Sequence, residues 1–71
     1  MTYHDILLAH TVARTLDYNL SGAQAMVTHG HNRDAAWRAE QAKGNLRELA
    51  AIMGFDLVPR LDAVKAAREV A

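Results

Sequence analysis

The stretch that decides the fold reads AAWRAEQAKGNLRELAAIM over residues 35–53. Apolar residues recur in it at alternating steps of four and three, the spacing of the a and d positions of a heptad repeat. Gly54 follows where a left-handed residue ends a helix, and Asn32 precedes the stretch as an N-cap. Phe55 is then expected to pack back onto Leu49 or Ala50 as in a Schellman motif. We therefore predict a long central helix over about residues 32–53. Its heptad positions, called the predicted seam below, are Ala35, Ala39, Ala42, Leu46, Leu49 and Met53.

Before this stretch the sequence predicts two shorter helical segments. Thr2 and Asp5 form a capping-box pair, which indicates a helix from Thr2 to about Tyr18. Ser21 and Gln24 form a second such pair, which predicts a separate short helix that Gly30 interrupts. The apolar stripe expected on the first helix consists of Ile6, Ala9, Ala13, Leu16 and Leu20, widened by Leu8 and Val12.

After the central stretch, the residues from Phe55 to Val58 are expected to be extended, because a residue that precedes a proline avoids the α region. Pro59 then suits the first position of a last helix that reaches Val70. All the predicted elements are helical. The expected fold is therefore a single all-α domain over residues 1–71, either a small helical hairpin or a three-helix unit.

A chain of 71 residues without cysteine has a small core and no disulfide to support it. Two arrangements could bury the predicted seam. The first helix could fill it within one chain, or two copies could share it in a symmetric dimer. We expect the homodimer, because a second copy would enlarge the core.

Charge and hydropathy argue against several classes of function. Eight Lys and Arg balance eight Asp and Glu, so the chain lacks the basic excess typical of nucleic-acid-binding proteins. The longest apolar run, from Ile6 to Ala9, is far too short to span a membrane. No basic leader precedes a signal-type apolar stretch, and the cytoplasm is the expected location.

No residue pattern predicts catalysis. The histidines do not have the spacing of metal ligands, so we expect neither a metal nor another cofactor. Ser21 is the only serine, and its capping role accounts for it. We therefore expect that the protein is not an enzyme. The four histidines are His4, His10, His29 and His31.

Trp37 is the unusual residue of the central helix. It shares a heptad position with Gly44 and Ala51, opposite the predicted seam. Either the preceding helices cover Trp37 as ordinary core, or Trp37 stands at a protein interface, where Trp and Arg are enriched. The second alternative predicts a binding site for an unidentified protein partner that consists of Arg33, Trp37, Arg38, Gln41 and Gly44.

The sequence NLRELAAIMGFDLVPR over residues 45–60, after an alanine-rich helix, resembles short helical proteins encoded by phages and prophages. This resemblance implies a small accessory protein that binds and modulates a host or phage protein. The alternative function is a small DNA-binding transcriptional regulator with a degenerate helix-turn-helix around residues 46–70. Its weakness is the apolar connection from Phe55 to Pro59, which exceeds the usual turn.

Overall fold

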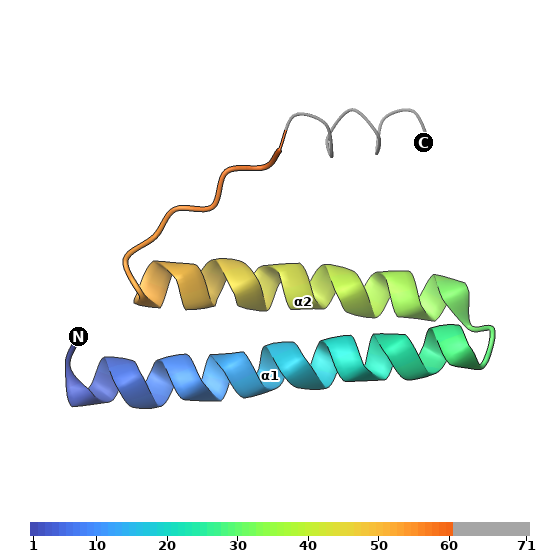
Figure 1. Cartoon of the computed structure of the whole chain (residues 1–71), viewed down its shortest axis with the longest axis horizontal. Helices are drawn as coiled ribbons and strands as arrows, with labels where there is room; N and C mark the ends of the chain where they lie inside the picture. The colour runs from blue at the N-terminus through green and yellow to red at the C-terminus, as the bar shows by residue number, and fades with distance from the viewer. Residues whose placement is uncertain (61–71) are drawn as a thin grey trace.

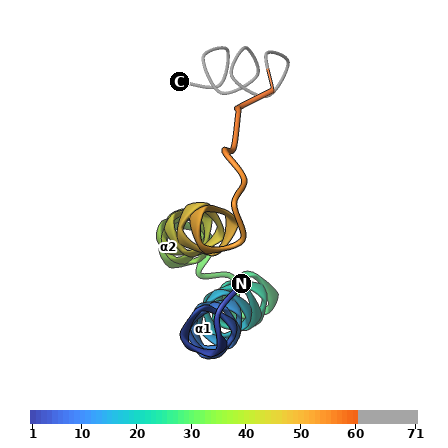
Figure 2. The ribbon, with the colours of Figure 1, turned by 90° about the vertical axis from the view of Figure 1, so that its left-hand side faces the viewer.

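The computed structural model describes residues 1–60 and contains two helices, α1 over Tyr3–Thr28 and α2 over Asn32–Ile52. The helices lie side by side in opposite directions and form a hairpin (Figures 1 and 2). No strand occurs among these 60 residues, so the all-α prediction is confirmed for them. Pro59 and Arg60, the first two residues of the last predicted helix, are not helical, and the rest of that prediction, to Val70, lies outside the described residues.

The start of α1 is the capping box that the sequence predicts. The Asp5 amide donates to the Thr2 hydroxyl at 3.1 Å, and the Thr2 amide donates to the Asp5 carboxylate at 3.1 Å. These two bonds satisfy backbone donors that a helix start otherwise leaves unpaired. The pKa of the Asp5 carboxyl is lowered below its usual value, first by the hydrogen bond from the Thr2 backbone amide and second by the Thr2 side chain.

The predicted break between Tyr18 and Ser21 is wrong, because α1 is continuous for 26 residues. Ser21 does not cap a second helix. Its hydroxyl instead donates to the Asp17 carboxylate at 3.5 Å, within the same helix. Asn19 and Ala23 pack toward α2 on either side of this point, and such tertiary packing stabilises a helix more than local propensity does.

Both helices end in the same left-handed turn. Gly30 has φ +80° and Gly54 has φ +88°, a conformation that is easily adopted only by glycine. At the end of α1, the His31 amide donates to the Met26 carbonyl at 2.8 Å, and at the end of α2 the Phe55 amide donates to the Ala50 carbonyl at 2.8 Å. Each is the six-to-one bond of a Schellman motif. Gly54 therefore ends the long helix as predicted.

The observed α2 agrees with the predicted central helix at both ends, but two local expectations fail. Asn32 is the first helical residue and not the N-cap, which is His31 and makes no side-chain capping bond. Phe55 was expected to fold back onto Leu49 or Ala50, yet its side chain remains exposed. The residues from 55 to 60 are extended and leave α2 on the side away from α1 (Figures 1 and 2).

The contact between the two helices, called the interhelical seam below, has small side chains as its buried residues and larger side chains that are half-buried. The buried residues of the described chain are Val12 and four alanines, and no large side chain among them is fully buried. Alanine lets two helices approach closely but contributes only one methyl group each. The helical positions that are buried or half-buried at alternating steps of three and four are Asp5, Ala9, Val12, Leu16, Asn19, Ala23 and Met26 in α1, and Ala35, Arg38, Ala42, Asn45, Leu49 and Ile52 in α2.

The two helices of the hairpin differ in length. Because α1 has five residues more than α2, its first turns extend beyond the end of α2 (Figure 1). Ile6 and Leu7 in these turns are exposed. Over residues 1–60, neither helix combines the length and the apolar character that crossing a membrane requires.

Candidate interaction surfaces

The six positions of the predicted seam do not lie on one side of α2. Ala35 and Ala42 are buried and Leu49 is half-buried at the interhelical seam. Leu46, in contrast, is 44% exposed and Met53 is 50% exposed, so these two face away from the interhelical seam. The intrachain alternative therefore describes half of these positions. Of the other half, the bulky Leu46 and Met53 face solvent and Ala39 is half-buried.

An asparagine pair occupies the middle of the interhelical seam. The side-chain amide nitrogen of Asn19 donates to the side-chain oxygen Oδ1 of Asn45 at 2.7 Å, and both side chains are half-buried. A buried polar group needs such a partner, since leaving it unpaired costs free energy. This bond aligns the two helices, because a shift of either helix along its axis would separate the two amides.

In both helices, every second position of the interhelical seam is followed directly by an apolar residue. Leu20 follows Asn19 and Leu46 follows Asn45, and in an antiparallel helix pair these two positions lie on the same side of the hairpin. Leu20 is 49% exposed, close to the value for Leu46. We call this surface the apolar side. It consists of Ile6, Ala13, Leu20 and Val27 from α1 and Ala39, Leu46 and Met53 from α2.

The opposite side of the hairpin, called the polar side, has a different composition. The residues that precede the interhelical seam on this side include Thr15 and Gly22 from α1 and three polar residues from α2, with Leu8 as the bulky apolar exception. The contrast with the apolar side is clear, because both sides flank the same interhelical seam. The polar residues that α2 supplies are Asp34, Gln41 and Glu48.

Arg38 crosses the polar side from α2 to α1. Its guanidinium carbon lies 4.5 Å from the centre of the Tyr18 ring, within the range of a cation–π contact. The crossing depends on Gly22, since a Cβ atom at that position would lie 2.6 Å from the Arg38 Cζ. The Arg38 Nε is buried without a hydrogen-bond partner among residues 1–60. Packing against Gly22 and Tyr18 therefore positions this side chain.

Trp37 directly precedes Arg38 and lies toward the polar side. Its side chain is 66% exposed, so the described part of the chain does not bury it as core. Arg33, Gln41 and Gly44 are exposed as well. Arg33 and Gln41 are four residues from Trp37, which places them on its face of the helix. The five residues predicted as a partner-binding site thus lie on one continuous part of α2, with Arg38 reaching from it to α1.

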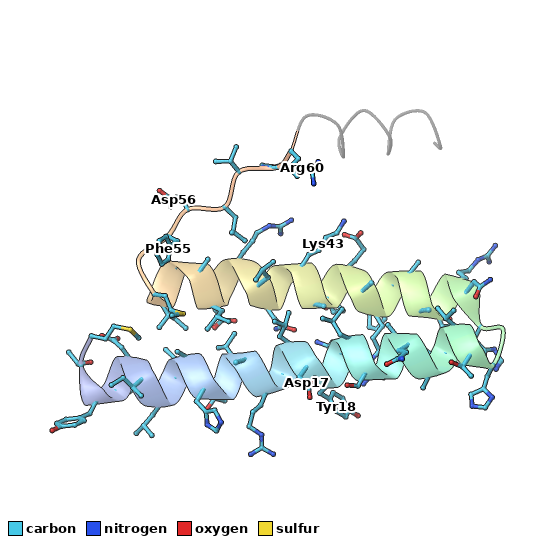
Figure 3. The ribbon with its side chains drawn as sticks, viewed as in Figure 1. Asp17, Tyr18, Lys43, Phe55, Asp56 and Arg60 are labelled. Atoms are coloured by element: carbon cyan, nitrogen blue, oxygen red, sulfur yellow. The ribbon has the colours of Figure 1, made fainter. Side chains whose placement is uncertain are left out.

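The side chains suited to chemistry do not form a site in residues 1–60. Within this range no group of three or more His, Asp or Glu residues could hold a metal ion. A shallow hollow on α1 is lined by His10, Arg14 and Tyr18 together with two threonines, and all five belong to a single helix. Figure 3 shows Tyr18 and its neighbour Asp17 directed away from α2.

Sequence reasoning missed the residues that distinguish the two sides. The predicted stripe of α1 placed Ile6 and Leu20 against a neighbouring helix, although both are largely exposed, and it left out Asn19. The available signal was the seven-residue repeat Ile6, Ala13, Leu20 and Val27, which becomes visible only when α1 is continued to Thr28. Tyr18 gave no sequence signal, because its contact with Arg38 depends on the pairing of the helices.

Comparisons with known proteins add no relative: no protein-family model, curated protein or solved structure matches the chain. The helix-turn-helix alternative depends on a second helix that lies outside the described residues. Within them, the extended connection from 55 to 60 is longer than the turn of such a motif.

Proposed function

We propose that this protein is a small helical protein-binding module without catalytic activity, and that it presents the polar side with Trp37 to a partner protein. The observation that carries this proposal is the exposure of Trp37, the only tryptophan in the chain. Tryptophan is a large side chain that folded proteins usually bury to a high degree. An exposed one next to an arginine has the composition of an interface hot spot.

The contact of Arg38 with α1 supports the same proposal. Tyr18 and Gly22 hold the guanidinium in one position before any partner arrives. A side chain that is ordered in advance loses less conformational entropy on binding. Trp37, Arg38 and Tyr18 therefore form the centre of the proposed binding surface, and Arg33, Gln41 and Gly44 form its edge along α2.

The proposal extends to the assembly and the setting of the protein. We propose that the working unit is a homodimer in the cytoplasm, and that the chain after residue 60 adds the third helix of the three-helix alternative. The resemblance to phage and prophage proteins supports a regulatory role, in which the module modulates a host or phage protein. The balanced charge of the chain weighs against the DNA-binding alternative, which requires tight and strongly salt-dependent binding.

Affinity capture with matched variants tests the proposed binding surface. Trp37→Ala should lose the proteins that the wild type captures, while its melting temperature changes little because the side chain is exposed. Tyr3→Ala is the control, since Tyr3 is an aromatic residue that is also exposed but lies at the opposite end of the hairpin from Trp37. It should capture the same proteins as the wild type. Equal capture by Trp37→Ala and the wild type would contradict the proposal, as would unfolding of Trp37→Ala.

A further inference from the structure

The apolar side is a second surface, separate from the one that carries Trp37. Its seven residues come from both helices, and five of them are bulky side chains that remain about half exposed. Together they expose on the order of 500 Å², the size of a patch that is often functional in a small protein. None of the seven is charged, so the surface is suited to burial against another apolar surface.

We infer that a second copy of this chain covers the apolar side, so that two hairpins form an antiparallel four-helix bundle. This inference rests on the proposed homodimer and assigns the surface that forms it. It replaces the predicted seam, half of which is already used within each chain. Two copies would bury about 1,000 Å² in total, the lower limit for a specific interface.

The length of the apolar side fits a second copy of the hairpin. The surface runs from Ile6 to Val27 along α1, which is about 32 Å of helix. A second hairpin has helices of 26 and 21 residues and matches the whole length.

Charges at the edge of the apolar side favour a particular pairing. Asp17 and Lys43 point outward from opposite edges of the hairpin (Figure 3). If α1 of one copy packs on α2 of the other, Asp17 approaches the opposite charge of Lys43, which also pairs with Glu40 of its own helix at 2.8 Å.

Sedimentation equilibrium with matched variants of the full chain tests this inference. The wild type should be a dimer at micromolar concentration. Leu46→Glu should raise the dissociation constant of the dimer on the order of 100-fold, because a charge would be buried at the centre of the interface. Leu7→Glu is the control, since Leu7 is even more exposed but lies outside the apolar side. It should remain a dimer. A wild-type monomer, or equal effects of both substitutions, would overturn the inference.

Crosslinking covers the case in which Leu46→Glu fails to fold. The chain has no cysteine, so each single-cysteine variant reports one position. Leu20→Cys should crosslink two chains efficiently with a short bismaleimide, whereas Leu7→Cys should do so only at the rate of random collisions. Equal crosslinking at both positions would contradict the assigned surface. Failure of Trp37→Ala to lose a partner would leave these results unchanged, so the two proposals are tested separately.

Discussion

The interhelical seam and the apolar side differ in the size of their residues, although they alternate along the same helices. The interhelical seam buries Val12 and alanines, together with the Asn19–Asn45 pair. The apolar side carries leucine, isoleucine, valine and methionine and leaves them exposed. The buried small residues determine how closely the helices of one chain approach, and half-buried large residues complete the seam, namely Leu16, Met26, Leu49 and Ile52. The large residues of the apolar side remain available for another molecule. Five exposed large apolar side chains are thus gathered where a second copy could cover them, namely Ile6, Leu20, Val27, Leu46 and Met53.

The largest effect is expected when a small buried residue of the interhelical seam is replaced by a large one. Ala42 is 2% exposed, and Ala42→Leu would add three carbon atoms where the helices are close. We expect a loss of about 1–3 kcal/mol in the free energy of unfolding, because overpacking forces the helices apart. Urea unfolding followed by circular dichroism measures it. Ala51→Leu, at an exposed position of the same helix, should change the free energy by less than about 0.5 kcal/mol. Similar effects of both substitutions would contradict close packing at Ala42.

The polar pair at the interhelical seam provides the second test. Asn19→Leu removes one partner and leaves the Asn45 amide unpaired, which should cost about 1–3 kcal/mol of stability. The double substitution Asn19→Leu, Asn45→Leu should recover most of this loss, because no unpaired polar group remains. A double-mutant cycle measures the coupling free energy. Additive effects of the two single substitutions would show that the hydrogen bond does not contribute.

Substitution of two helical glycines tests the packing of Arg38 on the polar side, because Gly22 lies against Arg38 and Gly44 faces open space. Gly44 has open space where a Cβ would lie, so Gly44→Ala should stabilise the protein by about 0.5–1 kcal/mol through helix propensity. Gly22→Ala should gain less or lose stability, because the new methyl group displaces Arg38 from Gly22 and Tyr18. In an Arg38→Ala background, the two glycine substitutions should have equal effects. Equal effects in the wild-type background would exclude the close contact of Arg38 with Gly22. Thermal melting measures each variant.

The smallest effect is expected at the start of α1, beyond the end of α2. The pKa of the Asp5 carboxyl is lowered in the folded state, below its usual value of 3.8, by the bonds from Thr2. A lowered pKa means that the ionised form stabilises the folded state above pH 3.8, and this stabilisation is lost as the pH falls through the lower folded-state pKa. Asp5→Asn should therefore flatten the acid limb of stability plotted against pH. An unchanged acid limb would contradict the capping bond.

The predictions from sequence agree with the structure where the interactions join residues that are close together in the chain. The Thr2–Asp5 cap, the left-handed Gly54 and the extent of the central helix each depend on residues a few positions apart, and all three were predicted correctly. The false break at Ser21 has the opposite cause. A capping box is a local pattern, but whether the helix stops there depends on packing against α2.

The sequence by itself determined that the regular elements of residues 1–60 are helices, where the long helix begins and ends, and that Trp37 lies apart from the predicted seam. Only the tertiary structure decided which stripe of each helix is buried. In a helix, adjacent positions differ in direction by about 100°, so Asn45 and Leu46 face different neighbours although either fits a heptad pattern. The pairing of Asn19 with Asn45 and the passage of Arg38 over Gly22 decide between these alternatives. Both contacts join residues far apart in the chain, and a periodic pattern cannot specify them.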